Sequence, residues 1–213
     1  LTSEMEARGW TCAPPIDVVF HPDYNLLHPV FAGIVIGLIL EGRFALIHLA
    51  PPCSSFSWAV NKWPTYAVRS LAHPSGIPGI PEYRQVRVDL GNSLAELALA
   101  FARAQEKAGM YWQWEQPWMS IMFDLPSVHS FISRHGIFQA IAWVCCWGAP
   151  WAKPTGAWSN RQRIMNINRG CPKYPHEHIT IQGHCPDGRN WTAVAGPDWP
   201  PFAADWAGCW DSL

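Results

Sequence analysis

The chain has 213 residues, a length typical of one domain and sufficient to bury a hydrophobic core without disulfide bonds. Hydrophobic residues make up 49% of it and charged residues only 15%, which excludes disorder for most of the chain. The 15 Lys and Arg residues balance 16 Asp and Glu residues, so a strongly basic nucleic-acid coat protein and a long acidic tail are also excluded. The unusual features are 14 Trp and 20 Pro residues, which indicate large aromatic surfaces and a loop-rich fold.

Strand-like and helix-like segments alternate in chain order up to residue 147. Residues 1–9 are expected to be the end of a helix closed by Gly9, and the chain is interpreted as a fragment because it begins with Leu1. The patterns predict strands at 16–20, 44–49, 110–114 and 140–147, and helices at 29–40, 86–108 and 126–135. This alternation predicts an α/β fold with a mostly parallel sheet.

The organisation of the chain is expected to be a core and an extension. Residues 1–158 are predicted to form the core, and residues 159–213 a loop-rich extension that packs on it. No signal peptide is visible, and the longest apolar run, 30–40, is too short to span a bilayer. The seven Cys residues are an odd number without a disulfide-rich spacing, which favours a reducing compartment. We therefore expect an intracellular protein, nuclear in a eukaryote, with no membrane partner.

Three turn clusters follow predicted strands, where ligands gather in parallel sheets. The first is Ala-Pro-Pro-Cys-Ser-Ser-Phe-Ser at 50–57, in which two prolines stiffen the loop that aims the Cys53 thiol. Such a thiol suits a nucleophile if its pKa is lowered, although Cys more often packs as a small hydrophobe.

The second and third clusters contribute a carboxylate and a cation. Glu115 stands among apolar residues in Trp-Glu-Gln-Pro-Trp at 114–118, where poor hydration tends to raise a carboxyl pKa. The alternative interpretation of Glu115 is an ordinary solvated Glu in a loop. The third cluster, 147–155, has a Gly-x-Pro turn followed by Lys153, and its alternative is a surface turn with a solvated Lys.

These clusters, in this order, resemble the DNA cytosine-5 methyltransferases. The closest likeness is to divergent, retroelement-associated methyltransferase-like domains with Pro-Pro-Cys-Ser-Ser-Phe-Ser and Glu-Asn-Pro signatures, and it covers roughly residues 9–207. The resemblance implies a Rossmann-like methyltransferase fold, truncated at its N-terminus, whose first strand and cofactor loop would precede Leu1. It also implies S-adenosylmethionine as cofactor and DNA as partner, with RNA as an open alternative.

The resemblance assigns roles to individual residues. Cys53 matches the nucleophile that attacks carbon 6 of cytosine, Glu115 matches the acid at ring nitrogen 3, and Lys153 takes the place of an Arg on the substrate side. For the cofactor, the matching residues are Asp17, Asn25 and Pro51, with Asp17 at the ribose and Asn25 at the adenine amino group.

Two other functions stay open. The resemblance leaves the cofactor loop before Leu1, and the third cluster departs from the family, with Lys153 in place of an Arg, so the domain is alternatively a catalytically inactive, retroelement-derived relic or a nucleic-acid-binding domain. Gln116 also stands where the family has Asn. A thiol hydrolase that pairs Cys53 with His48 or His73 is the third interpretation.

The remaining candidates concern nucleic acid and metal. Residues that are candidate walls of a pocket for a flipped base are Phe56, Trp58, Trp63 and Trp118. Residues available for phosphate contacts are Arg69, Arg84, Arg87, Arg161 and Arg163. The Cys/His-rich residues of the C-terminal part are Cys171, His176, His178, His184 and Cys185. They lack a Cys-x-x-Cys pair, so no metal is expected, and structural zinc is the alternative.

Overall fold

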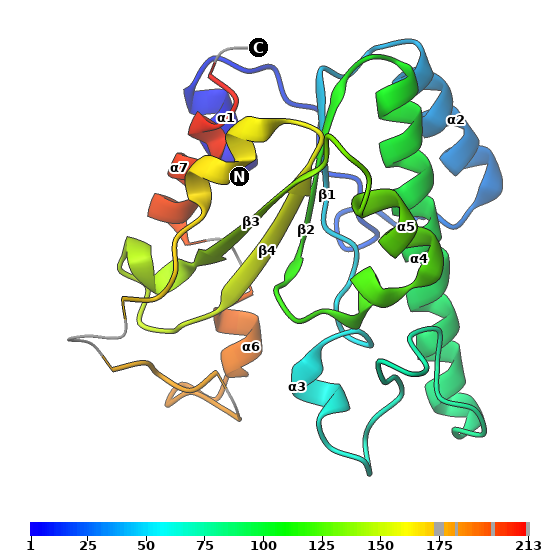
Figure 1. Cartoon of the computed structure of the whole chain (residues 1–213), viewed down its shortest axis with the longest axis vertical. Helices are drawn as coiled ribbons and strands as arrows, with labels where there is room; N and C mark the ends of the chain where they lie inside the picture. The colour runs from blue at the N-terminus through cyan, green and yellow to red at the C-terminus, as the bar shows by residue number, and fades with distance from the viewer. Residues whose placement is uncertain (173–176, 182, 197–198, 212–213) are drawn as a thin grey trace. The chain divides into compact units, whose positions relative to one another are not determined.

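The structure is a computed structural model that describes residues 1–172, 177–181, 183–196 and 199–211 (Figure 1). The α-helices are α1 (Thr2–Ala7), α2 (Pro29–Leu40), α3 (Trp58–Asn61), α4 (Glu82–Lys107), α5 (Pro126–Ile132), α6 (Trp191–Val194) and α7 (Pro200–Gly208). The strands are β1 (Leu46–Leu49), β2 (Tyr111–Pro117), β3 (Phe138–Trp143) and β4 (Pro154–Ser159). The short 3-10 helices are η1 (Pro22–Tyr24), η2 (Ile121–Asp124), η3 (Val144–Trp147) and η4 (Gln162–Ile167). The expected mixed α/β class is confirmed.

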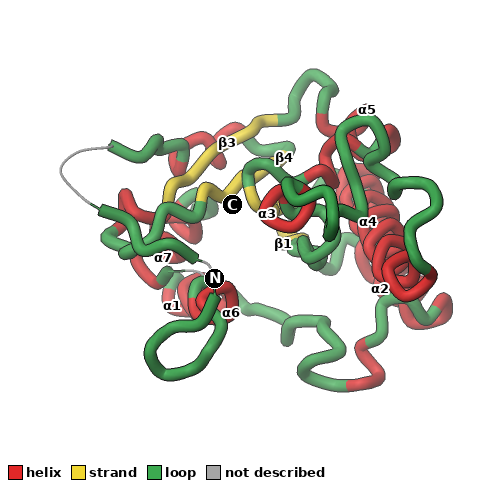
Figure 2. Tube along the Cα trace, turned by 90° about the horizontal axis from the view of Figure 1, so that it is seen from below, coloured by secondary structure: helices red, strands yellow, loops and turns green. Residues whose placement is uncertain are grey.

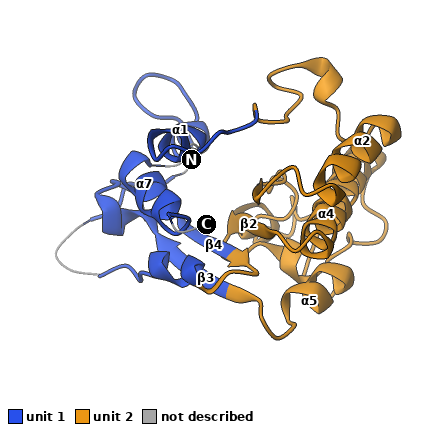
Figure 3. Ribbon diagram, turned by 90° about the horizontal axis from the view of Figure 1, so that it is seen from above, with its two compact units in different colours: residues 1–13, 139–157, 163–213 blue, residues 14–138, 158–162 orange. Residues whose placement is uncertain are grey.

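The chain divides into two compact units that interleave in sequence (Figure 3). Unit 1 comprises residues 1–13, 139–157 and 163–213, and unit 2 comprises residues 14–138 and 158–162. Strand β4 therefore begins in unit 1 and ends in unit 2.

Unit 2 is built around the parallel pair β1 and β2. Leu46 pairs with Tyr111 and Leu49 with Trp114, so the two strands end at the same edge. The connection between them contains α4, as a parallel connection requires, and α2 lies beside α4 (Figures 1 and 2). The core of this unit includes Trp112 and Trp114, both fully buried. The predicted helices at 29–40 and 86–108 and the strands at 44–49 and 110–114 are thus confirmed with shifts at their ends.

The prediction of a mostly parallel sheet is wrong. The sheet has the order β1-β2-β4-β3, in which β1 and β2 form the parallel pair and the sheet is otherwise antiparallel (Figure 1). The link between β3 and β4 spans only residues 144–153 and contains a single 3-10 turn. A parallel connection needs a crossover of a dozen residues or more, so β4 instead turns back beside β3.

The predicted strand at 16–20 is also wrong, because this segment forms a turn. The Asp17 carboxylate accepts a hydrogen bond from the Val19 amide at 2.9 Å, and the Asp17 carbonyl accepts from Phe20 at 3.0 Å. A short acidic side chain that bonds its own backbone competes with strand pairing, and the prolines at 14 and 15 have no amide to donate.

Unit 1 packs α1 against α7. The Arg8 guanidinium forms an ion pair with Asp211 and donates to the Ala204 carbonyl at 3.0 Å. Gly9 has a φ of 87° directly after the helix, as expected for a glycine that closes it. Among the described helices of the chain, none combines the length and the apolar content needed to cross a membrane.

Candidate active site

Residues 50–57, which we call the Cys53 loop, follow β1 and form a tight turn. Its Cys53 carbonyl accepts hydrogen bonds from the amides of Phe56 at 2.9 Å and Ser57 at 2.8 Å. The Ser57 hydroxyl then caps α3 by accepting from the Ala59 amide at 3.2 Å. Cys53 itself is half-buried. The backbone of this loop is therefore fixed on both sides of the thiol-bearing residue.

Glu115 lies on β2 at the same edge. It directly follows Trp114, the register partner of Leu49, and Cys53 stands four residues beyond Leu49. Its carboxylate is 3.8 Å from Nε2 of His48, and the Glu115 side chain is 16% exposed. The structure thus brings Cys53 and Glu115 to one edge of a parallel pair, and it adds His48 as a neighbour of the carboxylate.

Gln116 connects the Cys53 loop to the loop that follows β2. Its side-chain amide donates to the Pro51 carbonyl, and its oxygen accepts from the Ser120 hydroxyl at 3.1 Å. A second connection is the Ile121 amide, which donates to the Phe56 carbonyl at 3.0 Å. From the sequence Gln116 was only a departure from the family pattern, whereas here it joins two of the predicted clusters.

The buried guanidinium of Arg69 contacts the Cys53 loop at Ser55 and Phe56. Arg69 is fully buried, and its guanidinium lies over the Phe56 ring, 3.7 Å from the ring centroid. It donates to the Ser55 hydroxyl at 3.1 Å and to the Val88 carbonyl at 2.9 Å. Burial lowers the pKa of Arg69 to about 10, although nearby Asp89 raises it, so the group is charged at neutral pH. The expectation that Arg69 contacts phosphate is wrong, because the side chain is enclosed.

Helix α4 accommodates this guanidinium with a glycine and an asparagine. The Asn92 oxygen accepts from Arg69 at 2.7 Å, and its amide donates to the Ser75 carbonyl at 2.9 Å. A Cβ atom on Gly91 would lie 2.6 Å from the Ser55 hydroxyl oxygen and 3.0 Å from an Arg69 nitrogen. Gly91 is therefore required for the close approach of the loop to the helix.

Asn61 forms a further clamp. Its amide donates to the carbonyls of Ser55 at 2.9 Å and Ser57 at 3.0 Å. Its oxygen accepts from the amides of Val68 at 3.0 Å and Arg69 at 2.9 Å. The Cys53 loop is thus held by side chains from three segments of unit 2.

The four candidate aromatic walls divide equally. Phe56 is fully buried beneath Arg69 and belongs to the core, whereas Trp118 is half-buried and stacks on Trp158 with 6.0 Å between ring centroids. Trp58 is 43% exposed and Trp63 is 53% exposed, which leaves both rings available to a ligand.

The residues assigned to the cofactor lie before α2, except Pro51. Asp17 and Asn25 are exposed, and Asn25 accepts the Leu27 amide at 3.0 Å, much as Asp17 accepts that of Val19. The carbonyl of Pro51 accepts the Gln116 amide.

Lys153 belongs to unit 1, whereas Cys53 and Glu115 belong to unit 2. Its amine donates to the Gly196 carbonyl at 2.8 Å, and its backbone φ is 22°, in the left-handed region. Within unit 1, Lys153 therefore connects the turn before β4 to Gly196 by a hydrogen bond.

A pocket of about 310 Å³ lies in unit 2 at the amino end of β2. Its lining includes Glu106, Arg134 and Asn160, with the Arg134 guanidinium 2.9 Å from the Glu106 carboxylate. It therefore lies at the opposite end of β2 from Glu115.

In comparisons with known proteins, no family model, no curated protein and no solved structure matches this chain.

Proposed function

We propose that the chain is a methyltransferase-like domain that acts on a cytosine of DNA, with Cys53 as nucleophile and Glu115 as its acid partner. The observation that carries this proposal is their placement at one edge of the parallel pair β1 and β2, with the two loops joined by Gln116. A nucleophile gains most from a backbone that is already fixed, because correct orientation lowers the entropic part of the barrier.

The β1-α4-β2 unit, a parallel strand pair connected through a helix, supports a Rossmann-like fold. In open α/β sheets, ligands bind beyond the carboxyl ends of the parallel strands, and Cys53 and Glu115 both lie there. The mixed order of the sheet is compatible with this placement because the parallel pair alone positions both residues.

The residues before α2 fit the adenosine part of S-adenosylmethionine in their chemistry. Asp17 uses one oxygen for the Val19 amide, and its second oxygen can accept a ribose hydroxyl. The neighbouring Val19 is 83% exposed and Phe20 is 66% exposed, which offers an apolar surface to a flat base. When bound, S-adenosylmethionine supplies an electrophilic methyl group.

The chain's own residues would carry the remaining chemistry. The Cys53 thiolate adds to carbon 6 of cytosine, and the electron pair of the 5,6 double bond moves to carbon 5. Glu115 donates a hydrogen bond or a proton at ring nitrogen 3, which stabilises the adduct. After carbon 5 has gained the methyl group, its proton leaves to a base, and the re-formed double bond expels the thiolate. His48, 3.8 Å from the Glu115 carboxylate, orients that group.

An exposed aromatic and cationic surface of unit 2 supports a nucleic-acid substrate. It consists of the exposed residues Trp58, Lys62, Trp63 and Tyr66, on or just after α3, and of the half-buried Arg84 at the start of α4. The Lys62 amine lies 5.4 Å from the Trp63 ring centroid, and the Arg84 guanidinium donates to the Thr65 carbonyl at 2.8 Å. Exposed rings interleaved with cations stack on unpaired bases and neutralise phosphates.

The test is a covalent trap with two arms. In the first arm, the protein is mixed with S-adenosylmethionine and DNA that carries 5-fluorocytosine, whose fluorine blocks the final elimination. In the second, the DNA carries 2-pyrimidinone, an electrophilic base that captures a thiol at carbon 6 without cofactor. We expect a denaturation-resistant adduct that Cys53→Ser abolishes and that Glu115→Gln slows.

Cys12→Ser is the matched control, since Cys12 is also half-buried, and it should leave the adduct unchanged. An adduct with 2-pyrimidinone alone would support the nucleophile and contradict methyl transfer. A folded protein that gives no adduct in either arm but still binds DNA would favour the inactive nucleic-acid-binding relic. Acylation of Cys53 by an activated ester in the absence of nucleic acid and S-adenosylmethionine would favour a thiol hydrolase.

A further inference from the structure

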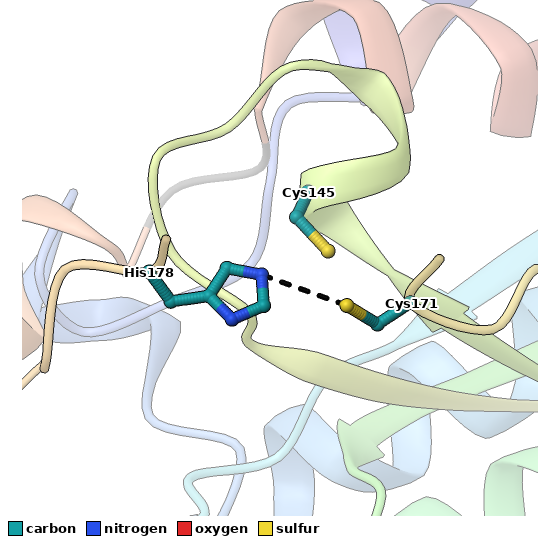
Figure 4. Close-up of side chains that lie close together, drawn as sticks. All are labelled: Cys145, Cys171 and His178. Carbon is teal, nitrogen blue, oxygen red and sulfur yellow. Dashed lines mark hydrogen bonds between the residues drawn. The ribbon is translucent and has the colours of Figure 1, made fainter. Parts of the chain in front are cut away.

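Three potential metal ligands converge in unit 1, apart from the residues of the proposed active site (Figure 4). They are Cys145, Cys171 and His178, and their ligand atoms all lie within 4.8 Å of one another. In Figure 4 the two thiols and the imidazole point toward a common centre. Cys145 is buried, Cys171 is half-buried and His178 is exposed, so one side of the cluster faces solvent.

The spacing matches tetrahedral zinc. Zinc binds thiolate sulfur at about 2.3 Å and imidazole nitrogen at about 2.0–2.1 Å, so a tetrahedral site places sulfur and nitrogen about 3.6 Å apart. The Cys171 sulfur and Nε2 of His178 are 3.6 Å apart. Two thiolate sulfurs bound to one tetrahedral zinc lie about 3.8 Å apart. This separation is compatible with the structure, in which the three ligand atoms all lie within 4.8 Å of one another.

Backbone hydrogen bonds hold the segments next to the three residues without any metal. Arg169 bonds to β3 as a short extra strand: its amide donates to Ile141 at 2.9 Å, and its carbonyl accepts from Trp143 at 3.0 Å. The bridge pairs Ala142 with Arg169, so Cys145 follows it by three residues on one side and Cys171 by two residues on the other. The residue after His178 is held as well, because the Ile179 amide donates to the Pro150 carbonyl at 2.7 Å.

We propose that Cys145, Cys171 and His178 bind one zinc ion, with water in the fourth position. Two thiolates and an imidazole form a soft donor set that suits zinc and disfavours magnesium and calcium. The ion would join three segments of unit 1: the turn after β3, the bridge at 169–171 and the segment at 178. This proposal does not rest on the methyltransferase proposal, and it replaces the sequence-based expectation of no metal. Of the five residues of the predicted Cys/His stretch, His176 lies outside the described residues.

Cys146 is the residue that needs to be distinguished from the three ligands. It neighbours Cys145 in the chain, but its thiol donates to the Gly170 carbonyl at 3.3 Å. We therefore assign Cys146 to the surroundings of the ion rather than to its ligands.

The experiment measures zinc and cobalt binding by the chain purified without a metal-binding tag. We expect one zinc per chain by elemental analysis, and a cobalt-substituted form with the intense visible bands of a tetrahedral site and a charge-transfer band of two thiolates. Loss of an outer-sphere partner alone weakens metal binding about 10- to 100-fold, so loss of a direct ligand should cost at least that much. Cys145→Ser, Cys171→Ser and His178→Gln should each show this loss.

His178→Gln is the variant expected to disturb folding least, because its side chain is exposed, and far-UV circular dichroism of the metal-free protein should match that of the wild type. The matched controls are Cys146→Ser and His184→Gln, which should keep stoichiometric zinc. Purified protein that binds neither metal, or His178→Gln that keeps wild-type affinity, would overturn the proposal. A disulfide between Cys145 and Cys171 in protein kept under reducing conditions would overturn it as well. Neither result would bear on the adduct formed by Cys53.

Discussion

Replacing Gly91 by alanine tests the close packing of the Cys53 loop and Arg69 against α4. In an ordinary helix interior, Gly→Ala stabilises a protein by about 1 kcal/mol. At Gly91 the added Cβ would lie 2.6 Å from the Ser55 hydroxyl oxygen, well inside van der Waals contact. The same atom would lie 3.0 Å from an Arg69 nitrogen and from the Phe56 ring.

The clash can be relieved in two ways, and each lowers the free energy of unfolding. If the helix and the loop move apart, overpacking costs about 1–3 kcal/mol. If the Ser55 hydroxyl rotates away, the buried guanidinium loses an acceptor, and such a charged hydrogen bond contributes about 1.5–3 kcal/mol. Either cost exceeds or cancels the gain in helix propensity, so Gly91→Ala should lower the free energy of unfolding by about 0–2 kcal/mol.

Gly33→Ala is the matched control. Gly33 is also inside a helix, and its Cβ would meet nothing within 4 Å, so this variant should gain about 1 kcal/mol. Urea unfolding followed by tryptophan fluorescence gives both values from the shift of the midpoint at constant slope. If Gly91→Ala stabilises the protein as much as Gly33→Ala does, the close approach of the Cys53 loop to α4 is wrong.

Three further predictions concern neighbouring residues. Arg69→Met should lower the free energy of unfolding by about 2–4 kcal/mol because several buried acceptors lose their donor. The matched change at an exposed position, Arg43→Met, should stay within about 0.5 kcal/mol in the same urea assay. Gln116→Ala releases the Pro51 carbonyl, so iodoacetamide should alkylate the Cys53 thiol faster in that variant, and an unchanged rate would mean that this link does not restrain the loop. Trp63→Ala should weaken binding of single-stranded DNA by about 1–3 kcal/mol in fluorescence anisotropy while leaving the unfolding midpoint in place; equal affinity would remove this exposed ring from the interface.

The elements that could be predicted are those with a strong local signal. The helix at 29–40 begins at a proline, and the helix at 82–107 carries a long apolar repeat, so packing and local preference agree there. The position of Cys53 just after β1 and of Glu115 near the end of β2 is predictable because prolines follow or end both strands. Strand β4 was missed because its sequence, Pro-Thr-Gly-Ala-Trp-Ser, contains two residues that are rare in strands.

What the sequence could not reveal is the polar network behind the loop. Arg69 looks like any surface cation, since nothing in its local sequence indicates burial. A signal was nevertheless present in Gly91 and Asn92, which are poor helix formers inside an otherwise strong helix. Their presence there indicates a close approach and a polar partner, but only the fold identifies that partner as Arg69. Of the three residues in the proposed zinc site, Cys171 and His178 stand out in the Cys/His-rich stretch, but Cys145 does not, because it is far from Cys171 in the chain and approaches it only through the bridge at Arg169.

The buried Arg69 also bears on the choice between an enzyme and a relic. A buried charge is costly, and apolar residues of similar size often stabilise a protein at least as well. Arg69 holds the Ser55 hydroxyl and the Phe56 ring, both of which lie within three residues of Cys53. The network therefore fixes the position of the Cys53 loop, a geometry that a nucleophile needs and that an inert surface loop does not. Under the enzyme interpretation, Arg69→Lys should slow formation of the Cys53 adduct more than it weakens DNA binding, because a lysine cannot reproduce the planar fork of donors. Equal losses in both measurements would assign Arg69 to stability alone and would favour the relic.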